Sequence, residues 1–392
     1  MKHLLFYIMI FLLTGCSGIA KPPYPPGNSQ VDIPETEEPD EPQKPSEPED
    51  KSIFALYKAA ALSILKNMTS EEKVGQMFLA RCPVDEQSEL YLSMKPGGFI
   101  LFGRDFDGKT KKQVMDNIMY YQKKSSIPMI IAVDEEGGTV VRVSSNPLLS
   151  EKRFKSPQEL YAEGDLEKIK SDAEEKSELL LSLGINLNLA PVADVSVNES
   201  DFIYQRAFGK DAAETAEYVN AVISEMKKAG ISSTLKHFPG YGNNPDTHTG
   251  SAYDTRPYEQ FIQNDFIPFK SGIDSGAESI LVSHNVVEAI DSKLPASLSE
   301  EVISILRNDL NFTGIIMTDD LSMGAITGLQ TEIQPEIMAV LAGNDMLIVS
   351  DLEKSFKVLL DAVKNGEVSE DRIDESVLRI LQCKYYMNLM DN

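Results

Sequence analysis

The sequence predicts an α/β protein whose folded part is a single TIM-type (β/α)8 barrel. Short apolar stretches alternate with amphipathic helical patterns from residue 51 to residue 392, and this alternation is typical of βα units. Several of the apolar stretches are almost continuous in hydrophobicity, as parallel strands buried on both faces are. Their number approaches eight, and no GxGxxG follows the first of them. A closed barrel is therefore favoured over an open doubly wound sheet.

The expected elements share simple patterns. Seven apolar stretches of four to six residues are predicted to be strands: Gly98–Phe102, Pro128–Val133, Ile185–Ala190, Ser232–Leu235, Ser279–Val282, Gly314–Met317 and Asp345–Val349. Five amphipathic patterns between or after them are predicted to be helices: Ser171–Leu183, Ala212–Ala229, Ser299–Leu310, Phe356–Val363 and Ile373–Leu381. Such a series fits one catalytic domain over residues 51–392.

The first residues are typical of an export signal. Lys2 precedes an unbroken apolar run from Leu4 to Leu13, which is too short to span about 30 Å of hydrocarbon as a helix but fits a secretory signal. The run ends in Leu13-Thr14-Gly15-Cys16, which resembles the processing site of bacterial lipoproteins. We therefore expect residues 1–15 to be a signal peptide and Cys16 to be lipidated; the alternative is a plain signal with a chance cysteine.

Residues 16–50 are predicted to be a disordered acidic, proline-rich linker. Between residues 21 and 50 there are nine prolines, nine acidic residues and two lysines. Proline removes hydrogen-bond donors and like charges repel, so such a segment stays extended and solvated. Together with the lipid on Cys16, it would hold the barrel off a membrane surface. The chain is thus expected to be an exported, membrane-anchored lipoprotein outside the cytoplasm.

Charge and cysteine content restrict the function further. The formal net charge of −24 argues against a nucleic-acid partner, because phosphates would be repelled. Cys82 and Cys383 lie far apart in the sequence and no metal-type spacing exists. Two buried thiols are favoured over a disulfide between them.

Histidines mark the ends of predicted strands. Apart from His3 in the signal, the chain has His237, His248 and His284, and each falls just beyond such a strand, where the chemistry of a barrel gathers. Asp246 stands two residues before His248 in a loop rich in Gly, Asn and Pro. A carboxylate at that spacing can fix the tautomer of the imidazole and stabilise its cation, which makes a proton shuttle.

Asp319 directly follows the predicted strand Gly314–Met317 and Thr318. A carboxylate at a strand end points into the barrel mouth and can act as a nucleophile. The alternatives are a helix cap or an ion pair with a lysine. Its neighbour Asp320 suits the capping role better.

Seven segments carry a resemblance to glycoside hydrolase family 3, in its β-N-acetylglucosaminidase (β-N-acetylhexosaminidase) branch. They are Met68–Met77, Gly97–Phe102, Asp134–Gly138, Arg206–Gly209, Lys236–His248, Gly314–Met323 and Asp371–Val377. The similarity spans most of residues 60–390. It implies retaining hydrolysis through a covalent glycosyl-enzyme, with Asp319 as nucleophile and His248, oriented by Asp246, as general acid and base. No cofactor or metal is implied, and a monomer is expected.

The same resemblance implies residues that hold the sugar. Asp134, Arg206, Lys236 and His237 match positions that bind the hydroxyls and the N-acetyl group. The expected substrates are N-acetylglucosaminides such as muropeptides. Asp194 and His284 also fall in segments that resemble the family, but the resemblance assigns them no definite role. For Asp194, a structural hydrogen bond beneath the loops is as good an interpretation as a functional role.

Three residues depart from the family pattern, and several functions stay open. Tyr241 stands where His is more frequent, Thr247 replaces Ser, and Thr139 stands where Arg is common. A β-glucosidase or a phosphorolytic variant of the family is an alternative chemistry. A non-catalytic sugar-binding lipoprotein and a metal-dependent hydrolase with His237, His248 and Asp319 as ligands are alternatives of other classes.

Overall fold

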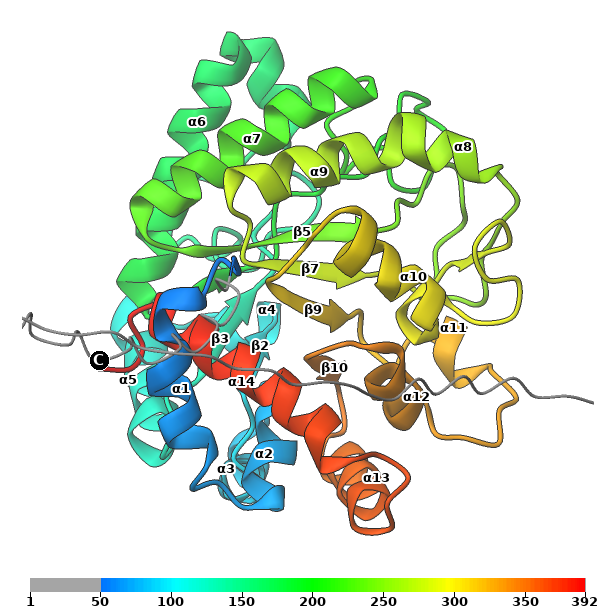
Figure 1. The fold of residues 1–392 in the computed structure, drawn as a ribbon. Coiled ribbons are helices and arrows are strands. Elements are labelled where there is room, and N and C mark those ends of the chain that lie inside the picture. The colour runs from blue at the N-terminus through cyan, green and yellow to red at the C-terminus, as the bar shows by residue number, and fades with distance from the viewer. Residues whose placement is uncertain (1–50, 392) are drawn as a thin grey trace, which may run out of the picture. The chain divides into compact units, whose positions relative to one another are not determined.

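Eight parallel strands form a barrel at the centre of the computed structural model, which describes residues 51–391 (Figure 1). The strands are β1 (Phe78–Arg81), β2 (Gly98–Leu101), β3 (Ile130–Val133), β4 (Leu187–Asn188), β5 (Ser232–Phe238), β7 (Ser279–Val282), β9 (Ile315–Thr318) and β10 (Leu347–Val349). They are hydrogen-bonded in the order β10-β1-β2-β3-β4-β5-β7-β9. A parallel bridge between Met317 and Met346 connects the two end strands. The predicted (β/α)8 fold is confirmed.

Helices surround the strands (Figure 1). They are α1 (Lys58–Leu65), α2 (Ser70–Gln76), α3 (Ser88–Ser93), α4 (Gly103–Phe106), α5 (Lys111–Lys124), α6 (Pro157–Leu183), α7 (Ala212–Ala229), α8 (Tyr258–Gln260), α9 (Phe266–Ser275), α10 (Glu300–Ser304), α11 (Gly324–Thr327), α12 (Pro335–Ala342), α13 (Leu352–Lys364) and α14 (Glu370–Tyr386). Short 3-10 and π turns and a two-stranded parallel pair, β6 (Tyr253–Asp254) with β8 (Val286–Val287), complete the described chain.

Local sequence explains where several helices begin. The hydroxyl groups of Thr69, Thr110 and Ser156 each accept a hydrogen bond from the backbone N–H three residues further on. The side chain at that later position in turn accepts the backbone N–H of the cap residue. Such capping boxes satisfy N–H groups that have no partner within the helix. All five predicted helices are present, and the segment Ser299–Leu310 forms α10 followed by a π-helical turn over Ile305–Asp309.

The strand β1 is the barrel strand that sequence reasoning missed. It has only four residues, Phe78–Arg81, and follows directly on α2 and Met77. A short apolar run beside a helix has no periodicity of its own that would separate it from that helix. Its partners β2 and β10 reveal it, because their backbones hydrogen-bond to it on either side.

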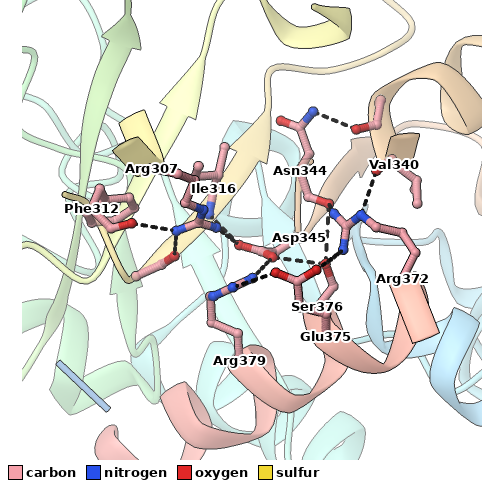
Figure 2. A network of polar contacts seen from close by, with 12 residues as sticks. Arg307, Phe312, Ile316, Val340, Asn344, Asp345, Arg372, Glu375, Ser376 and Arg379 are labelled. Carbon is pink, nitrogen blue, oxygen red and sulfur yellow. Dashed lines mark hydrogen bonds and ion pairs between the residues drawn. The ribbon is translucent and has the colours of Figure 1, made fainter. Parts of the chain in front are cut away.

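A buried ionic network ties α14 to the barrel between β9 and β10 (Figure 2). One carboxylate oxygen of Asp345 accepts hydrogen bonds from Arg307 at 2.6 Å and from the backbone N–H of Ile316 at 2.9 Å. The other oxygen contacts Arg379 and accepts the hydroxyl of Ser376 at 2.9 Å. Burial opposes ionisation of Asp345, but the surrounding guanidinium groups outweigh it and lower the pKa. This network fixes a helix to strands from which the site extends.

Both remaining cysteine thiols, Cys82 and Cys383, are free and buried, as predicted. Among helices of the described chain, none combines the length and the hydrophobicity that crossing a bilayer requires. The predicted signal peptide, Cys16 and the acidic linker lie outside the described residues, so the lipid anchor stays a prediction.

Candidate active site

A cavity of about 430 Å³ opens where the strands of the barrel end. It is lined by six of the seven residues that the sequence predicts for catalysis and sugar binding: Asp134, Arg206, Lys236, His237, His248 and Asp319. The seventh, Asp246, does not line the cavity and instead binds His248. Residues from four separate strand ends are thus brought together, as the parallel barrel predicts.

Two cations and two carboxylates form a compact group on one wall. The ammonium of Lys236 lies 2.6 Å from both Asp134 and Glu136. Glu136 also receives two hydrogen bonds from Arg206, at 2.7 and 3.0 Å. Burial favours the neutral form of Glu136, but Arg206 and Lys236 outweigh it and hold the pKa far below the usual range. Glu136 is therefore ionised, and the ion-paired group offers donors and acceptors to a polyhydroxylated ligand.

The ring of His237 is fixed in one tautomer. Its Nδ1 lies 2.7 Å from a carboxylate oxygen of the buried Asp194, and its Nε2 lies 3.0 Å from a guanidinium nitrogen of Arg206. Because the guanidinium can only donate, Nε2 accepts and Nδ1 carries the proton. Asp194 also accepts the backbone N–H groups of His237 and Tyr241, so it lies beneath the cavity as a structural support.

Asp319 extends from the end of β9 into the cavity. One of its carboxylate oxygens accepts the N–H of Asp320 at 2.8 Å. Burial opposes its ionisation, but the polar surroundings, this N–H among them, outweigh burial and lower the pKa of Asp319. Asp320 turns to other partners, the N–H of Ser322 and, at 2.7 Å, the hydroxyl of Ser350. The two aspartates therefore have different partners. Asp320 holds the turn after β9 and does not cap α11, whose N-cap is Met323 without a side-chain cap, so the expected capping role is wrong.

His284 is buried behind Asp320 and does not line the cavity. Its Nε2 lies 3.0 Å from the carbonyl oxygen of Asp320, which can only accept, so Nδ1 accepts the hydroxyl of Ser297 at 2.7 Å. Burial lowers the pKa of His284. The ring is a neutral support for the segment that follows β9.

His248 lies on the loop between β5 and β6, with 59% of its side chain exposed. Its Nδ1 lies 2.6 Å from Asp246, whose same oxygen accepts the backbone N–H of His248. That bond places a proton on Nδ1 and leaves Nε2 as the nitrogen that can reach a ligand in the cavity.

The loop that carries His248 is attached at two places. The buried Thr247 bonds through its hydroxyl to that of Tyr241, so two of the departures from the family pattern contact each other. The backbone carbonyls of Thr247 and His248 accept the N–H groups of Ala325 and Gly324, at 3.1 and 3.3 Å. Gly324 opens α11 five residues after Asp319, and the imidazole loop is therefore docked onto the segment that carries the carboxylate.

The glycines of this loop are required by close packing. Gly240 has φ +120°, and a Cβ there would lie 2.3 Å from a carboxylate oxygen of Asp265. Gly242 has φ +52°, and a Cβ would lie 2.5 Å from the guanidinium of Arg256. Arg256 joins Asp265 and Asp254 at 2.9 and 2.7 Å. A side chain at either glycine would displace this ion-pair group.

Sequence reasoning missed three residues that shape the cavity. Arg81 and Arg142 line it, and Glu136 holds Arg206 and Lys236 in place. Glu136 belongs to the segment Asp134–Gly138, which the sequence analysis did identify. Because it is the third charged residue in a row after a strand, it could have been predicted to lie near the site. Arg142 lies in the loop after β3, and Arg81 ends the strand that was itself missed. Without β1, nothing in the sequence placed Arg81 at the mouth of a barrel.

No three His, Cys, Asp or Glu side chains within residues 51–391 are arranged to hold a metal ion. The metal alternative required His237, whose Nε2 already accepts from Arg206. A metal at that nitrogen would have to displace a guanidinium.

An ionised strand-end aspartate and a carboxylate-bound imidazole share a polar cavity at the mouth of a parallel barrel. These features define a barrel enzyme of the glycoside hydrolase class. A sequence profile described as the glycosyl hydrolase family 3 N terminal domain matches residues 69–383. The chain belongs to glycoside hydrolase family 3, and it is a hydrolase.

Several relatives are similar to this chain. The β-hexosaminidase of Xanthomonas campestris pv. campestris is 32% identical over 231 residues, which are 58% of this chain and 69% of that protein. The β-hexosaminidase LpqI of Mycobacterium tuberculosis is 27% identical over 333 residues, 81% of this chain and 83% of LpqI. A solved family 3 β-N-acetylglucosaminidase from Paenibacillus sp. str. FPU-7 superposes with a TM-score of 0.77 at 30% identity, over 83% of this chain and 64% of that structure.

Proposed function

We propose that this chain is a retaining exo-β-N-acetylglucosaminidase that removes terminal β-linked N-acetylglucosamine from peptidoglycan fragments. The observation that carries the proposal is that one cavity receives the carboxyl group of Asp319 and the imidazole of His248. The names of the similar β-hexosaminidases support the sugar.

The charged wall suits recognition of the sugar. Asp134 and Arg206 carry polar atoms into the cavity from the ends of different elements, as do Lys236 and His237. In the proposal these groups hydrogen-bond to the hydroxyls and the N-acetyl group. Because Glu136 holds Arg206 and Lys236 in place, their donors are oriented before the sugar binds, which lowers the ordering cost of binding.

The proposed reaction has two displacements. Asp319 attacks the anomeric carbon as the glycosidic bond breaks, and the leaving oxygen takes the proton from Nε2 of His248. Asp246 stabilises the imidazolium before that transfer. The neutral imidazole then removes a proton from water, which attacks the same carbon and releases Asp319. Two inversions give retention, and a histidine takes the part usually played by a second carboxylate.

Three substrates and two variants test the proposal. The wild type should release N-acetylglucosamine from its 4-methylumbelliferyl β-glycoside and from muropeptides, and should leave the matching β-glucoside intact. Asp319→Ala and His248→Ala should each lose about two orders of magnitude or more in kcat/KM. Asp274→Asn, a change at an exposed ion pair, is the matched control. Cleavage of the β-glucoside in preference contradicts the sugar assignment.

Trapping of the covalent glycosyl-enzyme, together with chemical rescue, distinguishes a hydrolase from a sugar-binding protein and from a phosphorylase. A mechanism-based fluorinated N-acetylglucosamine analogue should add one sugar mass to the peptide that contains Asp319. Azide should restore aryl-glycoside cleavage to the His248→Ala variant, because a small nucleophile replaces the water that needs a base. An unlabelled protein that only binds the sugar indicates a binding lipoprotein. A rate that needs inorganic phosphate, with a sugar phosphate as product, indicates a phosphorylase.

The location is proposed from the sequence alone. Lipidation of Cys16 would tether the enzyme outside the cytoplasm, where wall fragments are. A fatty-acid probe should label the full-length chain in a bacterial host, and Cys16→Ala should abolish the labelling. Equal labelling of both proteins contradicts the anchor.

A further inference from the structure

His284 connects the segment after β7 to the residue that follows the proposed nucleophile. Its side chain is completely buried and does not line the cavity. The Nε2 nitrogen lies 3.0 Å from the carbonyl oxygen of Asp320, and the Nδ1 nitrogen lies 2.7 Å from the hydroxyl of Ser297. A side chain that has two directed hydrogen bonds but no access to a substrate can affect the reaction only through its neighbours.

Ser297 selects the tautomer of His284. A carbonyl oxygen can only accept, so the bond to Asp320 needs a proton on Nε2. The hydroxyl of Ser297 then donates to Nδ1 and satisfies the other nitrogen. Without that hydroxyl the ring is free to carry its proton on Nδ1, and the lone pair of Nε2 would then face the lone pairs of the carbonyl. Burial lowers the pKa of His284, which favours the neutral ring at neutral pH.

Asp320 is held at both of its backbone groups. Its N–H donates to the carboxylate of Asp319 at 2.8 Å. Its carbonyl oxygen accepts the ring N–H of His284 and the backbone N–H of Met323, each at 3.0 Å. Only two soft dihedral angles separate the N–H and the carbonyl of one residue. A bond that fixes the carbonyl of Asp320 therefore also restricts where its N–H points.

The support of Ser297 extends to the buried ionic network. The backbone N–H of Ser297 donates to the carbonyl of Ser283 at 3.0 Å, and the carbonyl of Ser297 accepts the side-chain amide of Asn344 at 2.8 Å. The backbone carbonyl of Asn344 in turn accepts a guanidinium N–H of Arg372 on α14 at 2.8 Å (Figure 2). Ser297 is therefore fixed on both sides and can hold the ring of His284 in one place.

We propose that His284 and Ser297 are positioning residues for the nucleophile: they hold the carbonyl of Asp320 so that the N–H of Asp320 stays on the carboxylate of Asp319. The inference rests on the proposed function, because it needs Asp319 to form and release a bond to the sugar. An N–H at this place favours the ionised carboxylate, which is re-formed when water releases the sugar from Asp319. Loss of the hydrogen bond should therefore slow the second displacement more than the first.

The two displacements can be timed separately. The value of kcat/KM for the methylumbelliferyl glycoside reports the first displacement. Enzyme that the fluorinated analogue has labelled is freed of excess analogue, and the rate at which its activity returns reports the second displacement. A loss of packing without a positioning role would lower both rates alike.

Two substitutions of His284 differ in the ring nitrogen that they replace. The amide nitrogen of a glutamine reaches the place of Nε2 and can donate to Asp320, whereas that of an asparagine reaches only the place of Nδ1. His284→Asn should lower the reactivation rate about tenfold, because one buried hydrogen bond is lost, and should lower kcat/KM much less. His284→Gln should keep most of the wild-type reactivation rate. Ser297→Ala should lower that rate severalfold in the wild type and not at all in the His284→Gln protein, whose amide has no tautomer to select.

Ser177→Ala is the matched control, because it removes another buried serine hydroxyl, on α6, whose partner is the carbonyl of Ala173. It should leave the reactivation rate unchanged, and thermal unfolding of each variant measures its loss of packing. Equal reactivation rates for His284→Asn and His284→Gln, or equal losses in both displacements, overturn the inference. If His284→Asn does not fold, a Ser297→Ala protein that reactivates as fast as Ser177→Ala overturns it. A wild type that the fluorinated analogue never labels on Asp319 overturns the proposed function instead.

Discussion

Gly324 is packed so closely against the loop of His248 that no side chain fits between them. A Cβ at residue 324 would lie 2.7 Å from the carbonyl oxygen of His248 and 3.1 Å from the backbone nitrogen of Gly250. Both atoms belong to backbone, which cannot rotate away as a flexible side chain does. Gly324→Ala should therefore displace the segment that holds the proposed acid and base.

The size of the effect follows from these distances. A carbon and a carbonyl oxygen rest about 3.3 Å apart at their closest ordinary contact, so the carbonyl of His248 must move by roughly 0.6 Å. Misplacement of a catalytic group by 1 Å costs about a hundredfold, and a shift of this size should cost about tenfold in kcat/KM. The N–H of Gly324 would also lose its bond to that carbonyl, at 3.3 Å.

The assay compares leaving groups. In the proposed reaction, the leaving group of an alkyl or methylumbelliferyl glycoside needs a proton from His248, whereas that of a 2,4-dinitrophenyl glycoside leaves without one. Gly324→Ala should therefore lower kcat/KM about tenfold for the first kind and much less for the second. A general loss of folding would lower both alike, and thermal unfolding of the variant measures that separately.

Gly250→Ala is the matched control. Gly250 lies on the same loop, but a Cβ there meets nothing within 4 Å. Its leaving-group profile should equal that of the wild type. If Gly324→Ala keeps full activity on the alkyl glycoside, or loses activity on both kinds equally, the contact between the two loops does not position His248 and the reasoning is refuted.

Three further predictions concern buried polar groups. Asp345→Asn should lower the free energy of unfolding, measured with denaturant, by about 3–5 kcal/mol, because buried arginines lose their carboxylate. The control Asp361→Asn, at an exposed ion pair, should change it by about 0.5 kcal/mol or less. Equal effects of the two changes would contradict a stabilising role of the ionic network. Burial lowers the pKa of Lys384 to about 7, whereas an unfolded lysine titrates near 10.4. Between these two pH values the unfolded state therefore binds more protons than the folded state. The free energy of unfolding of the wild type should rise with pH by about 1 kcal/mol per pH unit relative to that of Lys384→Met. If plots of unfolding free energy against pH are parallel for the two proteins, Lys384 titrates normally. Tyr241→Phe leaves the hydroxyl of Thr247 buried without a partner and should lower kcat/KM severalfold. Adding Thr247→Val to this variant should restore part of the lost kcat/KM. If the losses of the two single variants simply add in the double variant, the two hydroxyl groups do not interact.

Local patterns in the sequence were sufficient for the fold class and for most of the cavity wall. Alternating strand and helix signals predict a parallel barrel, and the carboxyl ends of parallel strands meet at one mouth. For that reason Asp134, Lys236 and Asp319 could be placed together, although Asp134 and Asp319 are 185 positions apart in the chain. The Asp246-x-His248 pair was also readable, because a two-residue spacing is a local geometry.

The partners of these groups were decided by the tertiary structure. The ion pairs of Glu136, the support of His237 by Asp194 and the docking of Gly324 on the loop of His248 all join segments distant in the chain. No periodicity encodes such contacts, since they depend on side-chain directions and on separations of a few tenths of an ångström. The strand that ends in Arg81 was recognisable only from the neighbours that pair with it. The sequence determined which groups gather at the mouth, and three-dimensional packing decided which of their charges are neutralised.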